Sequence, residues 1–160
     1  MTKTKAGLLT GMALIVLGAG LPGVLNAADD ALTTIAKRRA LMRAQAAHAM
    51  AIDDFVEKGI GDPAVVAANA MGLFATAKLI PDLFPAGTGM DAYPGKTGAK
   101  PEIWTDRNGF QAAAAKLEEE SLKLFQAAQG GDKQAIADQF GALGKNACGG
   151  CHTTFRKKLE

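Results

Sequence analysis

The stretch Asn146-Ala147-Cys148-Gly149-Gly150-Cys151-His152 (NACGGCH) holds both cysteines and one of the two histidines of this 160-residue chain. It lies in a segment, residues 132–157, whose apolar side chains recur at helical spacing. Because residues i and i+3 share one side of a helix, both thiols should point the same way, with the imidazole adjoining them. The stretch therefore predicts a helix that offers two thiols and an imidazole to a single bound group.

Cys-x-x-Cys alone fits a redox dithiol, half a zinc site or a disulfide. A redox dithiol expects a thioredoxin-like βαβ context, which this helical pattern lacks. Structural zinc needs four ligands, and His48 is the only further cysteine or histidine available. A disulfide inside one helix would restrict very little chain. The following His152 favours another interpretation, because Cys-x-x-Cys-His is the attachment motif of c-type haem. We therefore predict one haem c per chain, bound covalently through Cys148 and Cys151, with His152 as the proximal iron ligand.

The N-terminus indicates export. Lys3 and Lys5 precede an apolar run from Gly7 to Leu25, which gives way to Asn26-Ala27-Ala28. This order of basic, apolar and small residues is typical of a secretory signal peptide. Glycines and Pro22 interrupt the run, which disfavours an uncleaved spanning helix. We expect residues 1–27 to be removed by cleavage after Ala27 or Ala28, leaving domain 28–160 in the periplasm with no membrane insertion.

The mature chain is close to neutral. The sequence has 18 Lys and Arg against 16 Asp and Glu, and the signal peptide accounts for Lys3 and Lys5. No basic cluster is interleaved with aromatic residues, so we expect no nucleic-acid partner. The length remaining after cleavage suits one domain with a single core.

Four segments have helical apolar spacing and together predict an all-α protein: residues 31–58, 63–78, 106–128 and 132–157. Asp62 before Pro63, and Thr105 or Asp106, are suitable N-caps. Gly130-Gly131 ends the third helix. The prolines and glycines of residues 81–101 predict a long loop without helix.

Four motifs resemble one known family across nearly the whole mature chain: KRRALM (37–42), LFPAGT (83–88), KPEIWTD (100–106) and ACGGCHTTFRKK (147–158). The chain resembles the class II c-type cytochromes, the cytochrome c′ and cytochrome c-556 family. Class I cytochromes c carry the haem motif near the N-terminus and fit poorly. The resemblance implies an antiparallel up-down-up-down four-helix bundle with covalently bound haem.

Members of this family differ at the sixth iron position: cytochromes c′ leave it open, and c-556-type members place a methionine there. The family pattern is an arginine in the first helix with the distal residue four positions later. It matches Arg38 and Met42; the alternative, Arg39, would put Arg43 over the iron. The resemblance thus implies the c-556 type, with Met42 as distal ligand. The expected function is single-electron transport by a low-spin His/Met haem, not enzymatic catalysis. The alternatives are a five-coordinate binder of nitric oxide or carbon monoxide, and a cofactor-free thiol or metal module.

The resemblance also implies roles for three other residues: Arg38 pairs with a haem propionate, Arg156 packs beside the proximal imidazole and Thr88 reaches the haem edge. It implies redox partner proteins, which it does not identify. Relatives often dimerise through their first two helices, so a monomer and a homodimer are both open alternatives. We expect His48 to be a surface or interhelix residue, Trp104 to pack in the core and Glu118-Glu119-Glu120 to form a solvated helix face.

Overall fold

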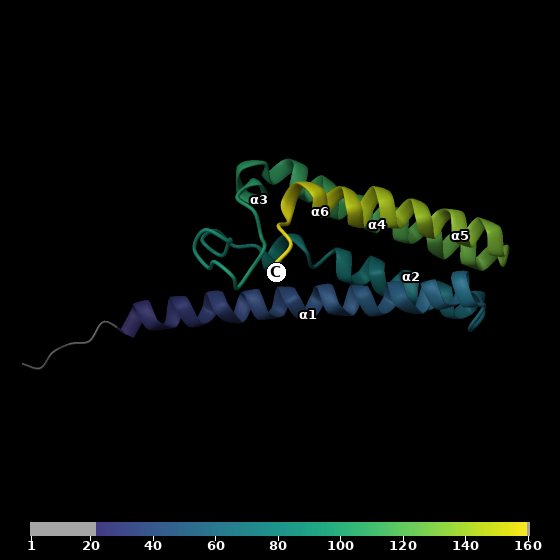
Figure 1. Ribbon diagram of the computed structural model, residues 1–160, viewed down its shortest axis with the longest axis horizontal. Coiled ribbons are helices and arrows are strands. Elements are labelled where there is room, and N and C mark those ends of the chain that lie inside the picture. Colours follow the sequence, from purple (N-terminus) through teal and green to yellow (C-terminus); the bar gives the residue numbers. More distant parts are fainter. Residues whose placement is uncertain (1–21, 160) are drawn as a thin grey trace, which may run out of the picture.

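The computed structural model describes residues 22–159. Its main helices are α1 (Pro22–Lys58), α2 (Pro63–Ala77), α4 (Arg107–Gly130) and a C-terminal run of α5 (Lys133–Ala142), η2 (Leu143–Gly149) and α6 (Gly150–Phe155). Successive members run in alternating directions, as the colour gradient shows (Figure 1). The prediction of an all-α, up-down-up-down four-helix bundle is confirmed.

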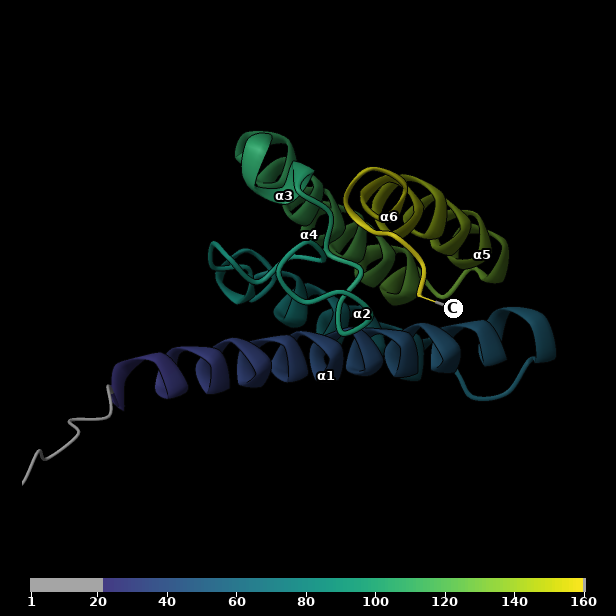
Figure 2. The same ribbon diagram turned by 60° about the vertical axis from the view of Figure 1, so that its left-hand side comes forward.

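Helix α1 begins earlier than predicted. Its 37 residues start at Pro22 instead of Ala31, and its first turns extend beyond the other helices (Figure 2). Both predicted cleavage points, after Ala27 and after Ala28, therefore lie within α1. Residues 1–21 of the predicted signal peptide lie outside the described residues.

The helix boundaries follow from local capping, as predicted. The carboxylates of Asp62, Asp106 and Asp132 each accept a hydrogen bond from the backbone N–H three residues later, at 2.8–2.9 Å. Of the two candidate caps for α4, Asp106 fills the role and Thr105 does not. Gly131 closes α4 with φ 74°, a left-handed conformation that glycine adopts without steric cost.

The segment between α2 and α4 is more structured than a plain loop. It contains a 3₁₀ turn, η1 (Pro81–Leu83), and is followed by one helical turn, α3 (Glu102–Thr105). The prediction that residues 81–101 hold no helix is therefore wrong at η1, where Pro81 supplies a φ suited to a tight turn. Near its end, Ala99 forms an isolated antiparallel bridge with Arg156.

The core lies mainly between α2 and α4, with α1 packed on α2 and α5 packed on α4. Three aromatic rings continue it toward the C-terminus: Phe110 makes edge-to-face contacts with Phe84 and with Phe155, at centroid distances of 4.9 and 5.3 Å. These contacts connect the loop, α4 and the end of α6. Among residues 22–159, no helix is long and apolar enough to cross a membrane.

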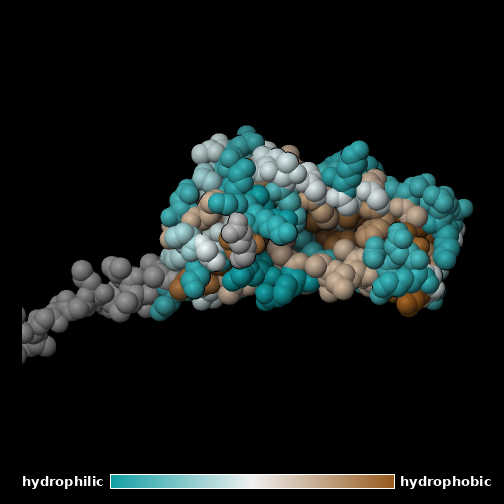
Figure 3. All heavy atoms as spheres, viewed as in Figure 1, coloured by the Kyte–Doolittle hydropathy of each residue, from teal (hydrophilic) through white to brown (hydrophobic). Residues whose placement is uncertain are grey.

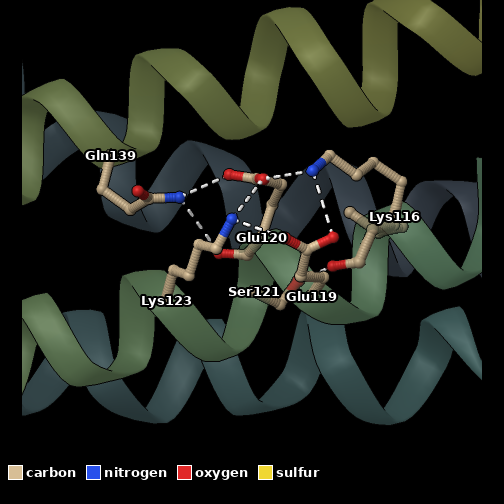
Figure 4. A network of polar contacts seen from close by, with 7 residues as sticks. Lys116, Glu119, Glu120, Ser121, Lys123 and Gln139 are labelled. Atoms are coloured by element: carbon tan, nitrogen blue, oxygen red, sulfur yellow. Dashed lines mark hydrogen bonds and ion pairs between the residues drawn. The ribbon is translucent and has the colours of Figure 1, made fainter.

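The Glu118-Glu119-Glu120 run is not the uniformly solvated face predicted from sequence. Glu120 is buried, and its carboxylate contacts Lys116, Lys123 and the Gln139 side chain of α5 (Figure 4). The hydrogen bond from Lys116 is the main reason that the pKa of Glu120 falls to about 2. Because α5 covers this side of α4, Glu120 joins the two helices instead of facing solvent.

Candidate functional site

The NACGGCH motif lies at a change of helix type. Residues Leu143–Gly149 form a π-helix, and α6 begins at Gly150, so Cys148 and Cys151 belong to consecutive elements. The predicted fourth helix is therefore continuous but not α throughout. A Cβ at Gly149 would lie 3.2 Å from the Gly144 carbonyl oxygen, which is a tight contact, so glycine suits the widened turn at this position. Segments of π-helix are frequent at functional sites.

The motif side chains are half-buried on the bundle. Both cysteines are free thiols and pack against the core without being covered by it. Burial raises the pKa of the Cys148 and Cys151 thiols. Burial, followed by the positive charge of Arg156, lowers the pKa of His152. Two neutral thiols and a neutral imidazole therefore lie together at neutral pH.

Arg156 follows the motif helix. It takes an extended conformation at the end of α6, and its side chain is exposed. Its positive charge lowers the pKa of His152 and of the Cys151 thiol, in each case by less than burial shifts the same group.

Arg38 and Thr88, predicted separately, lie in direct contact. The Arg38 Nη2 donates to Thr88 Oγ1 at 2.7 Å, and Nη1 donates to the Thr88 carbonyl at 3.1 Å. The same guanidinium donates to the Leu83 carbonyl and to Thr97 Oγ1, and it lies 3.9 Å from the Phe84 ring centroid. Arg38 is only 4% exposed, so it is not a solvated surface charge.

The charge of Arg38 has no carboxylate partner among residues 22–159, because its four hydrogen bonds all go to neutral oxygens. Burial lowers its pKa to about 10, which still leaves it protonated at neutral pH. A buried cation held by neutral acceptors favours a nearby anion. A haem propionate is such an anion, so the Arg38 site fits the predicted cofactor.

Met42 lies one turn after Arg38, on the inward side of α1. At the two ends of this side, other parts of the protein bury Ile35, Arg38 and Ile52. The residues between Arg38 and Ile52 on the same side are less buried. Met42 and Ala49 are half-buried, and Ala46 is exposed. The Gln45 amide nitrogen, in this same stretch, is buried without a hydrogen-bond partner in the described part of the chain. The middle of α1 is therefore a cradle of small and apolar residues that the other helices leave partly open.

The motif helix does not close this cradle. Helix α1 packs on α2 and touches α5 and η1, but it does not pack closely on α6. The space-filling view is hollowed between α1 and the C-terminal run, and the surface inside the hollow is apolar (Figure 3). The two half-buried thiols and the imidazole of the motif, together with the Met42 thioether on α1, are the donor groups that a flat apolar group bonded at its edge and ligated at its centre would need.

Two residues outside the site behave as expected. His48 Nδ1 is 2.9 Å from Asn69 Oδ1, so it bridges α1 and α2. Trp104 packs against the core, and its indole donates to the Phe84 carbonyl at 3.0 Å. Within the described residues, no group of three or more His, Cys, Asp and Glu side chains could hold a metal ion.

Sequence reasoning missed Thr97, whose hydroxyl accepts from Arg38 across a separation of 59 residues. No sequence pattern marks such a contact. A Cβ at Gly141 or Gly144 would meet no atom within 4 Å, so packing among the described residues does not require glycine at either position.

Fold and site together define a helical-bundle protein of the c-type haem class. The family model described as cytochrome c′ matches residues 33–156, and the chain belongs to the cytochrome c′ family of haem proteins.

Relatives within the family carry two names. Cytochrome c′ of Rhodospirillum rubrum is 33% identical over 133 residues, which cover 83% of this chain and 87% of the relative. Cytochrome c-556 of Agrobacterium tumefaciens (strain B2A) is 34% identical over 128 residues, covering 78% and 97%. Among solved structures, cytochrome c′ from Rhodobacter spheriodes superposes with a TM-score of 0.72 at 30% identity, covering 80% and 98%. A variant of cytochrome c prime from Alcaligenes xylosoxidans, solved as its nitric oxide complex, has a TM-score of 0.67 at 28% identity, covering 78% and 94%.

Proposed function

We propose that this chain is a periplasmic single-electron carrier that binds one haem c. Cys148 and Cys151 form its thioether bonds, His152 is the proximal ligand and Met42 is the distal ligand. When bound, haem iron supplies a reversible one-electron change between Fe(III) and Fe(II). The proposal rests on family membership and is supported by the half-buried position of Met42 in the cradle of α1, one turn after the buried Arg38.

The position of Met42 is the observation that favours a carrier. Its thioether is a soft neutral ligand, which together with imidazole favours the reduced state and raises the potential. Arg38, four residues earlier, is fixed by hydrogen bonds to the loop, so α1 has a defined rotation at Met42. Two protein ligands leave no position free for a gas or a substrate, which is also why we propose no enzymatic activity.

Three further residues, Arg38, Thr88 and Arg156, would contact the edge or the proximal side of the haem. We propose that Arg38 receives a propionate at the edge of the site where Thr88 lies, because the guanidinium is buried, protonated and without a carboxylate partner in the described residues. The Thr88 hydroxyl accepts from Arg38 and donates to the Pro85 carbonyl, so its part is to hold the guanidinium. We propose that Arg156, at the end of α6, packs beside the proximal imidazole.

A second candidate is a five-coordinate gas binder. It is favoured by the relatives named cytochrome c′ and by the nitric oxide complex solved for one of them. In this alternative, Met42 is a packing residue and nothing occupies the sixth position. Membership in a haem-protein family leaves the cofactor-free thiol or metal module without support.

Export and assembly belong to the same proposal. A signal peptide of residues 1–27 would deliver the chain to the periplasm, where redox proteins are its partners. Exposed apolar side chains on α1 and α2 are available for a second copy: Leu32, Met50, Val65 and Met71.

One absorption spectrum of the purified holoprotein tests the proposal. A six-coordinate His/Met site should give sharp, split α and β bands when reduced and a weak far-red band when oxidised. High-spin spectra in both states, with ready carbon monoxide binding, would favour the gas binder. Haem that acid–acetone extracts would reject covalent attachment.

A further inference from the structure

The loop before α3 joins the two elements that carry the proposed iron ligands. The strap, defined here as residues 97–100 (TGAK), contacts α1 at one end and the end of α6 at the other. At the first end, Thr97 Oγ1 accepts from Arg38 Nη1 at 3.3 Å and from the Ala99 N–H at 3.2 Å. The Thr97 hydroxyl thus meets α1 one turn before Met42.

At its other end, the strap pairs with the chain that leaves α6. The Lys157 N–H donates to the Gly98 carbonyl at 2.8 Å, and the Lys100 N–H donates to the Phe155 carbonyl at 3.1 Å. These bonds flank the Ala99–Arg156 bridge, and Lys100 Nζ donates to the Thr154 carbonyl at 2.7 Å. Three consecutive residues, Gly98 to Lys100, are therefore fixed to the chain at the end of the motif helix.

Gly98 makes this pairing possible. A Cβ at this position would overlap the backbone carbonyl oxygen of Lys157, which cannot turn aside as a flexible side chain could. Thr97 and Ala99 are also buried, so the strap is part of the packed structure. Helix α1 does not pack closely on α6. The strap is hydrogen-bonded to Arg38 of α1 and to the chain at the end of α6, so it connects the two helices by polar contacts.

We infer that the strap, through Thr97 and Gly98, is a positioning device that sets the separation of α1 from α6 and thereby keeps Met42 on the iron. This inference rests on the proposed His/Met function. Loss of the strap should leave the thioether bonds intact and allow Met42 to detach more often. Thr97 and Gly98 would then determine whether an exogenous ligand such as carbon monoxide reaches the sixth position.

Gly98→Ala in the holoprotein tests the inference, with Gly141→Ala as the matched control because a Cβ there meets no atom. Amide hydrogen exchange measured by NMR should accelerate about tenfold or more at Lys100 and Lys157 in Gly98→Ala only. The far-red band should weaken, and carbon monoxide should bind the reduced protein faster by a similar factor.

Gly98→Ala could prevent folding, so a second pair of variants, at Thr97, tests the inference separately. Thr97→Val removes the hydroxyl at nearly constant shape, and Thr97→Ser retains it. The valine variant should bind carbon monoxide faster than wild type, and the serine variant should match wild type. Faster amide exchange with an unchanged far-red band and unchanged carbon monoxide rate would overturn the inference.

Failure of the proposed function has a different signature. A wild-type protein without the far-red band would refute His/Met ligation while leaving the amide measurements valid. The inference about Met42 would then fall together with the proposed function, even if amide exchange at Lys100 and Lys157 were still faster in Gly98→Ala than in Gly141→Ala.

Discussion

Arg38 of α1 donates hydrogen bonds to both the hydroxyl and the carbonyl oxygen of Thr88, a residue 50 positions later in the chain. Both residues are buried, at 4% exposure each. This contact fixes a positive charge at the junction between α1 and the loop, one turn from Met42. The charge should affect the haem potential, whereas the hydrogen bonds should affect the stability of the fold.

Replacing Arg38 with leucine should lower the stability of the protein and change the haem potential. The Leu83 and Thr88 carbonyls would lose their donors, and each buried unsatisfied acceptor costs about 1–3 kcal/mol. Loss of the cation should also lower the haem potential or flatten its dependence on pH, since a propionate would lose its partner. Urea unfolding and a potentiometric titration across pH measure the two effects. Arg38→Lys, which keeps the charge, should restore more of the potential than of the stability. An unchanged potential in Arg38→Leu would limit the residue to a structural role.

Removing the thiols should remove the attachment. In Cys148→Ala with Cys151→Ala, acid–acetone should extract all haem, whereas wild-type haem should stay with the protein. The apoprotein should be less stable by several kcal/mol, because the apolar cradle on α1 would lose the group that fills it. Extraction, followed by thermal unfolding, gives both results. Covalent haem in the double variant would contradict the assignment.

Local signals predicted most of the helix boundaries. Asp62, Asp106 and Gly131 act within three residues of their own positions, so their capping roles can be predicted from sequence. The haem motif is equally local. The contact of Thr97 with Arg38 and the burial of Glu120 under α5 depend on segments far apart in the chain. The π-helix before the motif depends on how the last helix packs on α4, which apolar spacing does not encode.

Glu120 gives a stability effect with a defined pH dependence. Its pKa in the folded state is about 2, below the usual 4.5, so its stabilisation is present above pH 4.5 and is lost as the pH falls toward 2. Glu120→Gln should therefore cost about 1 kcal/mol at pH 7 and less at pH 3. Urea unfolding at the two pH values measures the difference. Glu118→Gln, a neighbour without an ion pair among the described residues, is the control. An equal loss at both pH values would show that the carboxylate charge is not the stabilising feature.

Gly72 and His48 should be energetically coupled. A Cβ at Gly72 would overlap the His48 ring, which bridges to Asn69 on α2. Gly72→Ala should therefore destabilise the protein by about 1–3 kcal/mol, although alanine is the better helix former. In the background of His48→Ala, the same change should be neutral or stabilising. Thermal unfolding of the four proteins gives the coupling energy, and additive effects would reject the steric explanation.

Met42 separates the electron carrier from the gas binder. Met42→Leu roughly conserves volume at a half-buried position, so it should cost less than about 1.5 kcal/mol. It should nevertheless abolish the far-red band, convert the haem to high spin and admit carbon monoxide, because leucine offers no ligand. Met71→Leu, at an exposed methionine of α2, should change none of these spectra. Absorption spectra with and without carbon monoxide decide the matter. If the wild type is already high-spin and Met42→Leu leaves its carbon monoxide binding unchanged, Met42 is a packing residue and the sixth position is open.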